Sequence, residues 1–226
     1  MKKQKAIKLR KQGNSYKQIS DKLDVAKSTL SYWLGNIEIS KEAQEKISKR
    51  ASKISAEALL KRNKKQTALA AGRAEKIRDD SRKEFSKLKG NKLFLVGVSL
   101  YWAEGYKKGA EGSKWKSVDF ANSDPEMVMI MMRFFREICE VGNERIKIQL
   151  MTHPNVEMEE ALRYWSEITE IPKNQFMRTC CAISKASNGK RPNRLTYGTV
   201  HIRINDVKLF FRIIGWIDGL KEMMKI

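Results

Sequence analysis

Cysteine and histidine are scarce in this sequence. Its 226 residues include three cysteines and two histidines. Cys139, Cys180 and Cys181 show no C-x-x-C spacing, and an odd number of cysteines argues against a disulfide framework. With His153 and His201 as the two possible imidazole ligands, a zinc site is not expected. We therefore expect free thiols in a reducing compartment.

Long apolar segments are also missing. No apolar run approaches the roughly 18 residues that indicate a membrane-spanning helix. The first residues, MKKQKAIKLRKQG, lack the apolar core of a signal peptide. These two observations favour a cytoplasmic protein without a membrane span.

Acidic residues are few relative to basic ones. The chain holds 46 Lys and Arg against 26 Asp and Glu, a formal net charge of +20. Residues 1–92 contain 26 Lys and Arg and 10 Asp and Glu, so +16 of that charge lies in this part. A basic front part joined to a near-neutral back part favours a polyanionic partner, with nucleic acid as the first candidate. An anionic membrane, the second candidate, would require a basic amphipathic helix with a clear apolar face.

Three short helices are predicted within residues 1–36. In the first twelve residues, apolar side chains recur at the spacing of a helix. This pattern ends at Gly13, a residue suited to the left-handed conformation that terminates helices. Ser15 can cap a second helix, YKQISDKL. After a short turn, AKSTLSYWL predicts a third helix that buries Leu30 and either Trp33 or Leu34.

The string QGNSYKQISDKLDVAKSTLSYWL resembles the helix-turn-helix of resolvases and of many bacterial and archaeal regulators. The resemblance implies that the third helix enters the major groove of DNA. Serine and threonine can bond bases or phosphates, whereas lysine favours phosphate. The residues expected to reach DNA are Lys27, Ser28, Thr29, Ser31 and Tyr32. The alternative is a three-helix packing module that does not touch DNA.

Residues 37–92 predict a basic helical connector. No proline occurs from Ser40 to Lys89, and helix-forming residues dominate. Gly72 could break or kink the helix. Apolar residues spaced 4-3-4 from Ile47 to Ala58 form a short coiled-coil-like stripe. The connector could therefore mediate a dimer contact, lie along the phosphates of DNA, or be a solvated charged surface.

Residues 93–226 predict a mixed α+β domain whose sheet is covered by helices on one face. Helical periodicity marks four segments: 93–104, 125–140, 156–169 and 206–220. Ser123 or Asp124 is expected to cap the second of these helices, with Pro125 in its first turn. Alternating polar and apolar residues predict four strands: 114–121, 145–151, 175–182 and 198–205.

The uncovered face of that sheet is predicted to be basic. Assigning one member of each pair to each face, we expect it to take one residue from each of three pairs, Lys114 or Lys116, Arg145 or Lys147, and His201 or Arg203. The long loop SKASNGKRPNR adds further basic residues, Lys190, Arg191 and Arg194. Such a surface could bind a DNA duplex. The alternative is that these side chains serve only solubility.

The segment GVSLYWAEG, residues 97–105, resembles the nine-residue LAGLIDADG motif of homing endonucleases. Ser99 stands for the small glycine of the motif and Glu104 for its catalytic acid, while Leu100, Ala103 and Gly105 match. In that family the motif helix packs against its symmetry mate, and the acid binds a divalent metal next to the scissile phosphate. The resemblance implies a helix followed by strands and helices, with a curved basic sheet on the DNA.

The resemblance also implies metal-dependent chemistry at Glu104, with Gly105 beside it. Carboxylates suit Mg²⁺, and a bound cation lowers the pKa of an attacking water. One acid per chain is too few for a two-metal site, so a homodimer and a near-palindromic DNA target are expected. The residues expected to pack between the two motif helices are Gly97, Ser99, Leu100 and Ala103.

Two functions fit these patterns best. One is a dimeric, metal-dependent, sequence-specific endonuclease of double-stranded DNA. The other is a non-catalytic transcriptional regulator that keeps the same fold for binding and dimerisation. A third, an RNA-binding protein that uses the connector, lacks an RNA-specific aromatic signature. Either of the first two would act on the nucleoid in the cytoplasm and would have no membrane partner.

Overall fold

The protein has an α+β fold in a computed structural model that describes residues 1–152, 156–181 and 196–225. The chain forms two compact units, Met1–Ala70 and Ala71–Ile226. The first is all helical, and the second holds the sheet. Residues 37–70 of the predicted connector belong to the first unit and residues 71–92 to the second.

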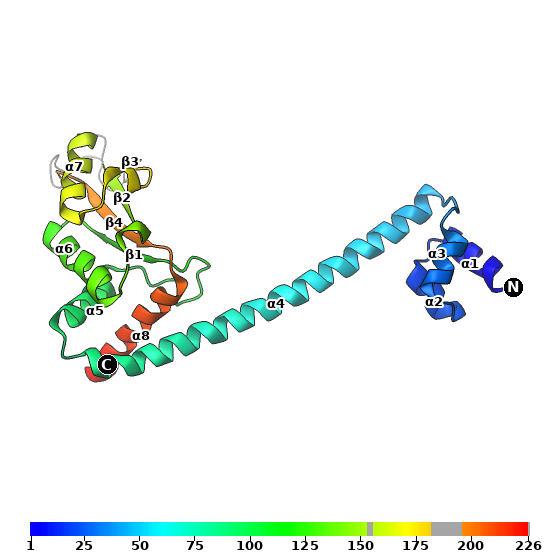
Figure 1. Ribbon diagram of the computed structural model, residues 1–226, viewed down its shortest axis with the longest axis horizontal. Helices are drawn as coiled ribbons and strands as arrows, with labels where there is room; N and C mark the ends of the chain where they lie inside the picture. The colour runs from blue at the N-terminus through cyan, green and yellow to red at the C-terminus, as the bar shows by residue number, and fades with distance from the viewer. Residues whose placement is uncertain (153–155, 182–195, 226) are drawn as a thin grey trace, which may run out of the picture. The chain divides into compact units, whose positions relative to one another are not determined.

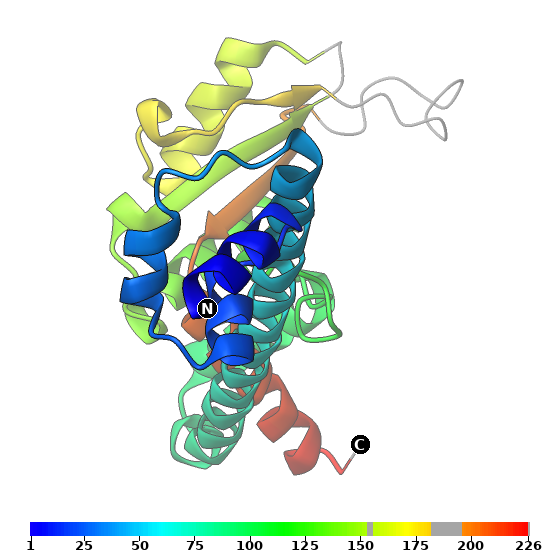
Figure 2. The ribbon, with the colours of Figure 1, turned by 90° about the vertical axis from the view of Figure 1, so that its right-hand side faces the viewer.

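Three short helices make up the start of the first unit: α1 (Lys2–Lys11), α2 (Tyr16–Leu23) and α3 (Lys27–Leu34), drawn in blue in Figure 2. Gly13 adopts a positive φ after α1. The Ser15 side chain accepts a hydrogen bond from the backbone N–H of Gln18 and so caps α2, as its sequence predicts. Leu30 and Leu34 are buried, with Ala6 and Ile19 on the other two helices, in a separate small core.

A single 48-residue helix, α4 (Lys41–Leu88), occupies most of the predicted connector. Gly72 lies inside it and does not end it. The first turns of α4 pack on the α1–α2 corner, where Ala43 is buried. Arg50 donates hydrogen bonds from Nη1 to Gln18 Oε1 (2.5 Å) and to the Gly13 carbonyl (3.2 Å). The start of α4 is therefore fixed on the three short helices.

The second unit contains a sheet with the strand order β1-β4-β2-β3 (Figure 1). Its strands are β1 (Val118–Asn122), β2 (Ile146–Thr152), β3 (Cys180–Cys181) and β4 (Thr199–Ile204). β4 runs antiparallel to both β1 and β2, while the two-residue β3 runs parallel to β2. The register places Phe120, Ile202 and Ile148 in one fully buried row. That row marks the core face of the sheet.

Among its described residues, the second unit holds four α-helices in addition to the end of α4: α5 (Lys92–Glu104), α6 (Pro125–Arg133), α7 (Met158–Thr169) and α8 (Val207–Met223). α5, α6 and α8 contact β1. Asp124 caps α6 by accepting from the N–H groups of Glu126 and Met127, as its sequence predicts. Single turns of 3₁₀-helix, Asn143–Arg145 and Lys173–Gln175, precede β2 and β3.

Three predicted elements differ from those observed. The strand expected over 175–182 is observed as the two-residue β3, because Gln175 ends a 3₁₀ turn and Phe176 makes only an isolated bridge to Ile148. The helix expected over 125–140 ends as an α-helix at Arg133 and continues as one π-helical turn, Phe134–Ile138. The strand expected from 114 begins at Val118, because the preceding residues form turns and irregular backbone. No helix in the described parts of the chain is long and apolar enough to cross a membrane.

The end of α4 packs on α8 in the main core. Phe85 is buried there with Phe94 and Trp216. The Glu84 carboxylate accepts from Arg212 Nη2 (2.7 Å) and from Trp216 Nε1 (3.0 Å). The hydrogen bond from Arg212 is the largest cause that lowers the pKa of Glu84. α4 is thus part of the second unit's core as well as the first unit's.

Replacing Gly97 with valine should destabilise the second unit. Gly97 lies on the buried side of α5, and an added Cβ would overlap the ring of Phe134. Overpacking of this kind costs about 2 kcal/mol. Ser99→Val is the matched control, because Ser99 is exposed on the same helix, and its cost should stay near ~0.5 kcal/mol. Chemical denaturation measures both, and equal stability of the two variants would contradict this packing.

Candidate nucleic-acid interface

The exposed side of α3 holds most of the residues expected to reach DNA. Leu30 and Leu34 anchor the helix in the small core, so the opposite side faces solvent. Thr29 is half-buried, while the remaining candidates are exposed: Lys27, Ser28, Ser31 and Tyr32. α3 contains no acidic residue. This surface presents hydroxyl groups and one cation in a pattern suited to a groove of DNA.

Tyr32 is the largest side chain on that surface, and 88% of it is exposed. A single exposed ring is normal on a protein surface, so Tyr32 is singled out because it lies among the residues expected to reach DNA. Its neighbour on the helix, Trp33, packs instead against the small core. Of these two neighbouring rings, Trp33 therefore stabilises the core, while Tyr32 is exposed to solvent.

The second basic surface is the solvent-facing side of the sheet, which carries fewer free cations than the sequence suggests. Our assignment of one residue of each pair to each face was wrong, because residues two apart on a strand point the same way. His201 and Arg203 both lie on this face, opposite Ala121 and Asp119 of β1. Lys147 of β2 lies opposite Arg203 and is half-buried.

A buried carboxylate binds the two β4 side chains of this face. Asp119 is only 6% exposed. Its Oδ1 lies 2.8 Å from His201 Nδ1, and its Oδ2 accepts from Arg203 Nε at 2.7 Å. The Arg203 guanidinium also lies over the ring of Trp115, 5.2 Å from its centroid. Asp119 therefore neutralises Arg203 and orients the imidazole of His201.

Three other predicted DNA contacts do not lie on the sheet. Lys114 and Lys116 precede β1 in irregular backbone. Arg145 precedes β2, and its Nη2 pairs with Asp206 Oδ2 at 2.6 Å. Three further candidates lie outside the described residues: Lys190, Arg191 and Arg194. Among the predicted sheet residues, Lys147, His201 and Arg203 are thus the three placed on the face itself.

The end of α5 presents the candidate catalytic acid. Glu104 is the last residue of the helix and is exposed. Gly105 is buried, and a Cβ there would collide with the Tyr101 carbonyl, so the chain needs glycine to leave the helix at this point. Lys107 donates from Nζ to the Gly105 carbonyl at 2.6 Å.

The surroundings of Glu104 bear on the expected metal site. A carboxylate and a backbone carbonyl are oxygen ligands of the kind that Mg²⁺ prefers. In this structure the Lys107 ammonium already contacts the Gly105 carbonyl, so a cation there would have to displace it. Partial burial lowers the pKa of Lys107, against the opposing charges of Glu104 and Glu111. Within the described residues, no three His, Cys, Asp or Glu side chains gather as a ready-made metal site.

The residues expected at a helix–helix dimer contact fall into two groups. Gly97 does not face a partner chain, because its close approach is to Phe134 of its own chain. Leu100 packs partly against the main core. Ser99 and Ala103 are exposed and lie one turn apart, so they remain available for such a contact.

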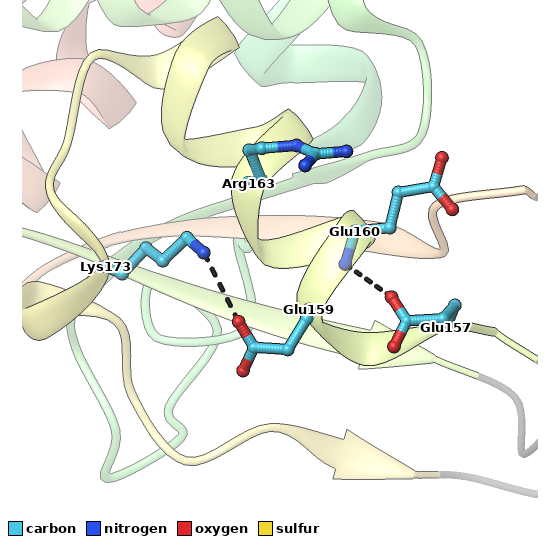
Figure 3. A pocket seen from close by; sticks show the side chains of 5 residues that line it. All are labelled: Glu157, Glu159, Glu160, Arg163 and Lys173. Carbon is cyan, nitrogen blue, oxygen red and sulfur yellow. Dashed lines mark hydrogen bonds and ion pairs between the residues drawn. The ribbon is translucent and has the colours of Figure 1, made fainter.

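An open cleft of about 330 Å³ lies at the start of α7 and holds none of the predicted residues (Figure 3). It is lined by Glu157, Glu159, Glu160, Arg163 and Lys173. Glu157 accepts from the Glu160 N–H and caps the helix, while Glu159 pairs with Lys173 at 3.3 Å. Capping and ion pairing thus account for these two carboxylates.

The comparisons with known proteins return nothing for this chain. No protein-family model matches it, and no significant match is found among curated proteins or solved structures.

Sequence reasoning missed the role of Asp119. It lies between two apolar residues, Val118 and Phe120, in a predicted strand, and that alternation could have placed it on the polar face. Its partners could not be found without the register between β1 and β4.

Asp119→Asn should destabilise the second unit by about 2 kcal/mol, because it weakens two hydrogen bonds to a charged group and leaves Arg203 without its counter-ion. Asp80→Asn, at an exposed position of α4, is the control and should cost less than ~0.5 kcal/mol. Urea unfolding compares the two. Equal midpoints would show that the Asp119 pairs contribute nothing to folding.

Proposed function

We propose that this protein binds double-stranded DNA in a sequence-specific manner through α3. The observation that carries the proposal is the exposed, acid-free side of α3 with its hydroxyl groups, Lys27 and Tyr32. The order of α1, α2 and α3 about one small core is similar to a helix-turn-helix, whose last helix reads base edges in the major groove. The excess of +16 in residues 1–92 supports attraction to phosphate.

Tyr32→Ala should weaken binding of the full chain to duplex DNA about 10-fold, because it removes a contact at the groove. Its exposure means that the fold should be unaffected. Met224→Ala, which removes an exposed apolar side chain at the end of α8, is the control and should leave affinity unchanged. Fluorescence anisotropy with a labelled duplex gives both values. If the Tyr32 variant binds DNA with unchanged affinity, α3 is not the helix that contacts the DNA groove.

For the second unit we propose a LAGLIDADG-like domain that cleaves DNA with a divalent metal. Support comes from Glu104, an exposed carboxylate next to the Gly105 carbonyl and to Lys107 at the end of α5. Glu104 and that carbonyl would hold Mg²⁺, which would supply an activated water and neutralise the phosphate. A homodimer through Ser99 and Ala103 would bring two Glu104 side chains to a near-palindromic site.

The alternative is a transcriptional regulator with the same fold and no cleavage. The contact of Lys107 with the Gly105 carbonyl favours this alternative, because an ammonium there competes with a metal ion. The endonuclease and the regulator would both bind double-stranded DNA. They differ in whether the Glu104 carboxylate holds a metal ion.

Glu104→Gln should abolish Mg²⁺-dependent cleavage of duplex DNA while leaving DNA binding within about 2-fold, because it removes the metal-binding charge and little else. Glu111→Gln is the matched control, since Glu111 is also exposed and also acts on Lys107, and it should still cut. Digestion of plasmid and genomic DNA is the readout. A wild-type chain that binds DNA but cuts none with Mg²⁺, Mn²⁺ or Ca²⁺ would establish the regulator.

A further inference from the structure

The middle of α4 has no packing role that explains its sequence. Every residue from 51 to 70 is exposed. The apolar side chains Ile54, Leu59 and Leu60 are each more than half exposed. A helix that buries no apolar face gains its stability from residue propensity alone, and binding of a partner would add to it.

The charge on this segment is strongly positive. Residues 46–65 contain eight lysines and arginines and one acid, Glu57. Glu45 lies just before the segment and pairs with Lys49 at 3.9 Å, with both side chains exposed. An exposed pair of this kind contributes little and leaves the lysine free to exchange partners.

The lysines gather on one side of the helix. Spacings of 3, 4 and 11 residues return to nearly the same direction at 3.6 residues per turn. Five lysines follow these spacings and define the basic face: Lys46, Lys49, Lys53, Lys61 and Lys64. Glu57, eleven residues after Lys46, lies among them, so the net charge of this side is five minus one, or +4. The opposite side carries three uncharged polar residues, Ser48, Ser55 and Gln66, and one cation, Arg62. Solubility alone would not require most of the lysines to lie on one side.

A coiled coil with a second copy of the chain fits this segment poorly. The apolar stripe that begins at Ile47 and ends at Ala58 would continue at Lys61 and Lys65. Two lysines in the seam of a homodimer would face their own copies and repel. The one-sided charge instead complements a polyanion.

The basic face has a fixed relation to the α1–α3 unit. Arg50 is bound to Gln18 and to the Gly13 carbonyl, so it belongs to the packing rather than to the face. An added Cβ on Gly13 would lie 3.3 Å from the Lys46 Cβ, which shows how closely the first turns of α4 are seated. α4 therefore leaves the α1–α3 unit at a defined angle and presents its lysines in a defined direction.

We propose that the basic face of α4 binds the phosphate backbone of the duplex whose groove α3 reads. This inference rests on the proposed DNA binding. From Lys46 to Lys64 the helix spans about 27 Å, a length along which a duplex presents many phosphates. Lysine suits this task, because it is a flexible point charge that contacts phosphate without demanding a fixed geometry. The contact adds affinity in a way that does not depend on sequence.

The test compares two triple variants of the full chain that have the same net charge. Lys49→Gln/Lys53→Gln/Lys64→Gln removes three positive charges from the basic face. Ser48→Glu/Ser55→Glu/Gln66→Glu adds three negative charges to the opposite side. Duplex affinity is measured from 50 to 300 mM salt, and circular dichroism verifies that both variants keep their helix content. Because the net charge is matched, a difference between them reports where the DNA lies.

The basic-face variant should lower the slope of log affinity against log salt by about 2 to 3, with similar loss for all duplex sequences. The opposite-face variant should change the slope by less than about 1. Equal slopes in the two variants would overturn the phosphate contact while leaving α3 binding intact. A loss of sequence discrimination in the basic-face variant would also overturn it. No binding by the wild-type chain would overturn the proposed function itself.

Discussion

The close packing of α4 on α8 is the contact on which the second unit depends. A Cβ on Gly215 or Gly219 would strike the backbone of α4 or the side chain of Phe85, so these glycines set how near the two helices come. At that distance Glu84 meets Arg212 and binds it through two hydrogen bonds. The lowered pKa of Glu84 means that this pair stabilises the fold near neutral pH and loses its contribution as the pH falls below the usual value of 4.5.

That packing explains why one helix can serve both units. The two ends of α4 are held by tight local contacts, Ala43 at the first unit and Phe85 at the second. Residues 51–70 between them bury nothing and carry charge instead. The exposed side of α3 and the basic face of α4 belong to the same compact unit. Under the proposed function, α3 would supply the base contacts that specify sequence and α4 the phosphate contacts that position the protein.

Most helices of this chain can be predicted because their signals are local. Ser15 and Asp124 are of the residue types that cap helix N-termini, and apolar residues at helical spacing mark the helices that follow them. The sheet face could not be predicted, because the binding of Arg203 by Asp119 requires the pairing of distant strands. The contact of Lys107 with the Gly105 carbonyl likewise depends on the conformation of the chain after α5. Glu104 can therefore be named as a candidate acid from the sequence, whereas the contact of Lys107 beside it cannot.

We propose that the chain recognises a specific DNA sequence. Repeated selection of duplexes from a randomised pool by the full-length protein, at physiological salt, tests it most directly. We expect the pool to converge on one motif, and the selected duplex to bind at least about 1,000-fold more tightly than the starting pool. If the pool stays random while the protein still retains DNA, the binding is electrostatic and does not depend on sequence. Failure to retain any duplex at low salt would show that the protein does not bind DNA.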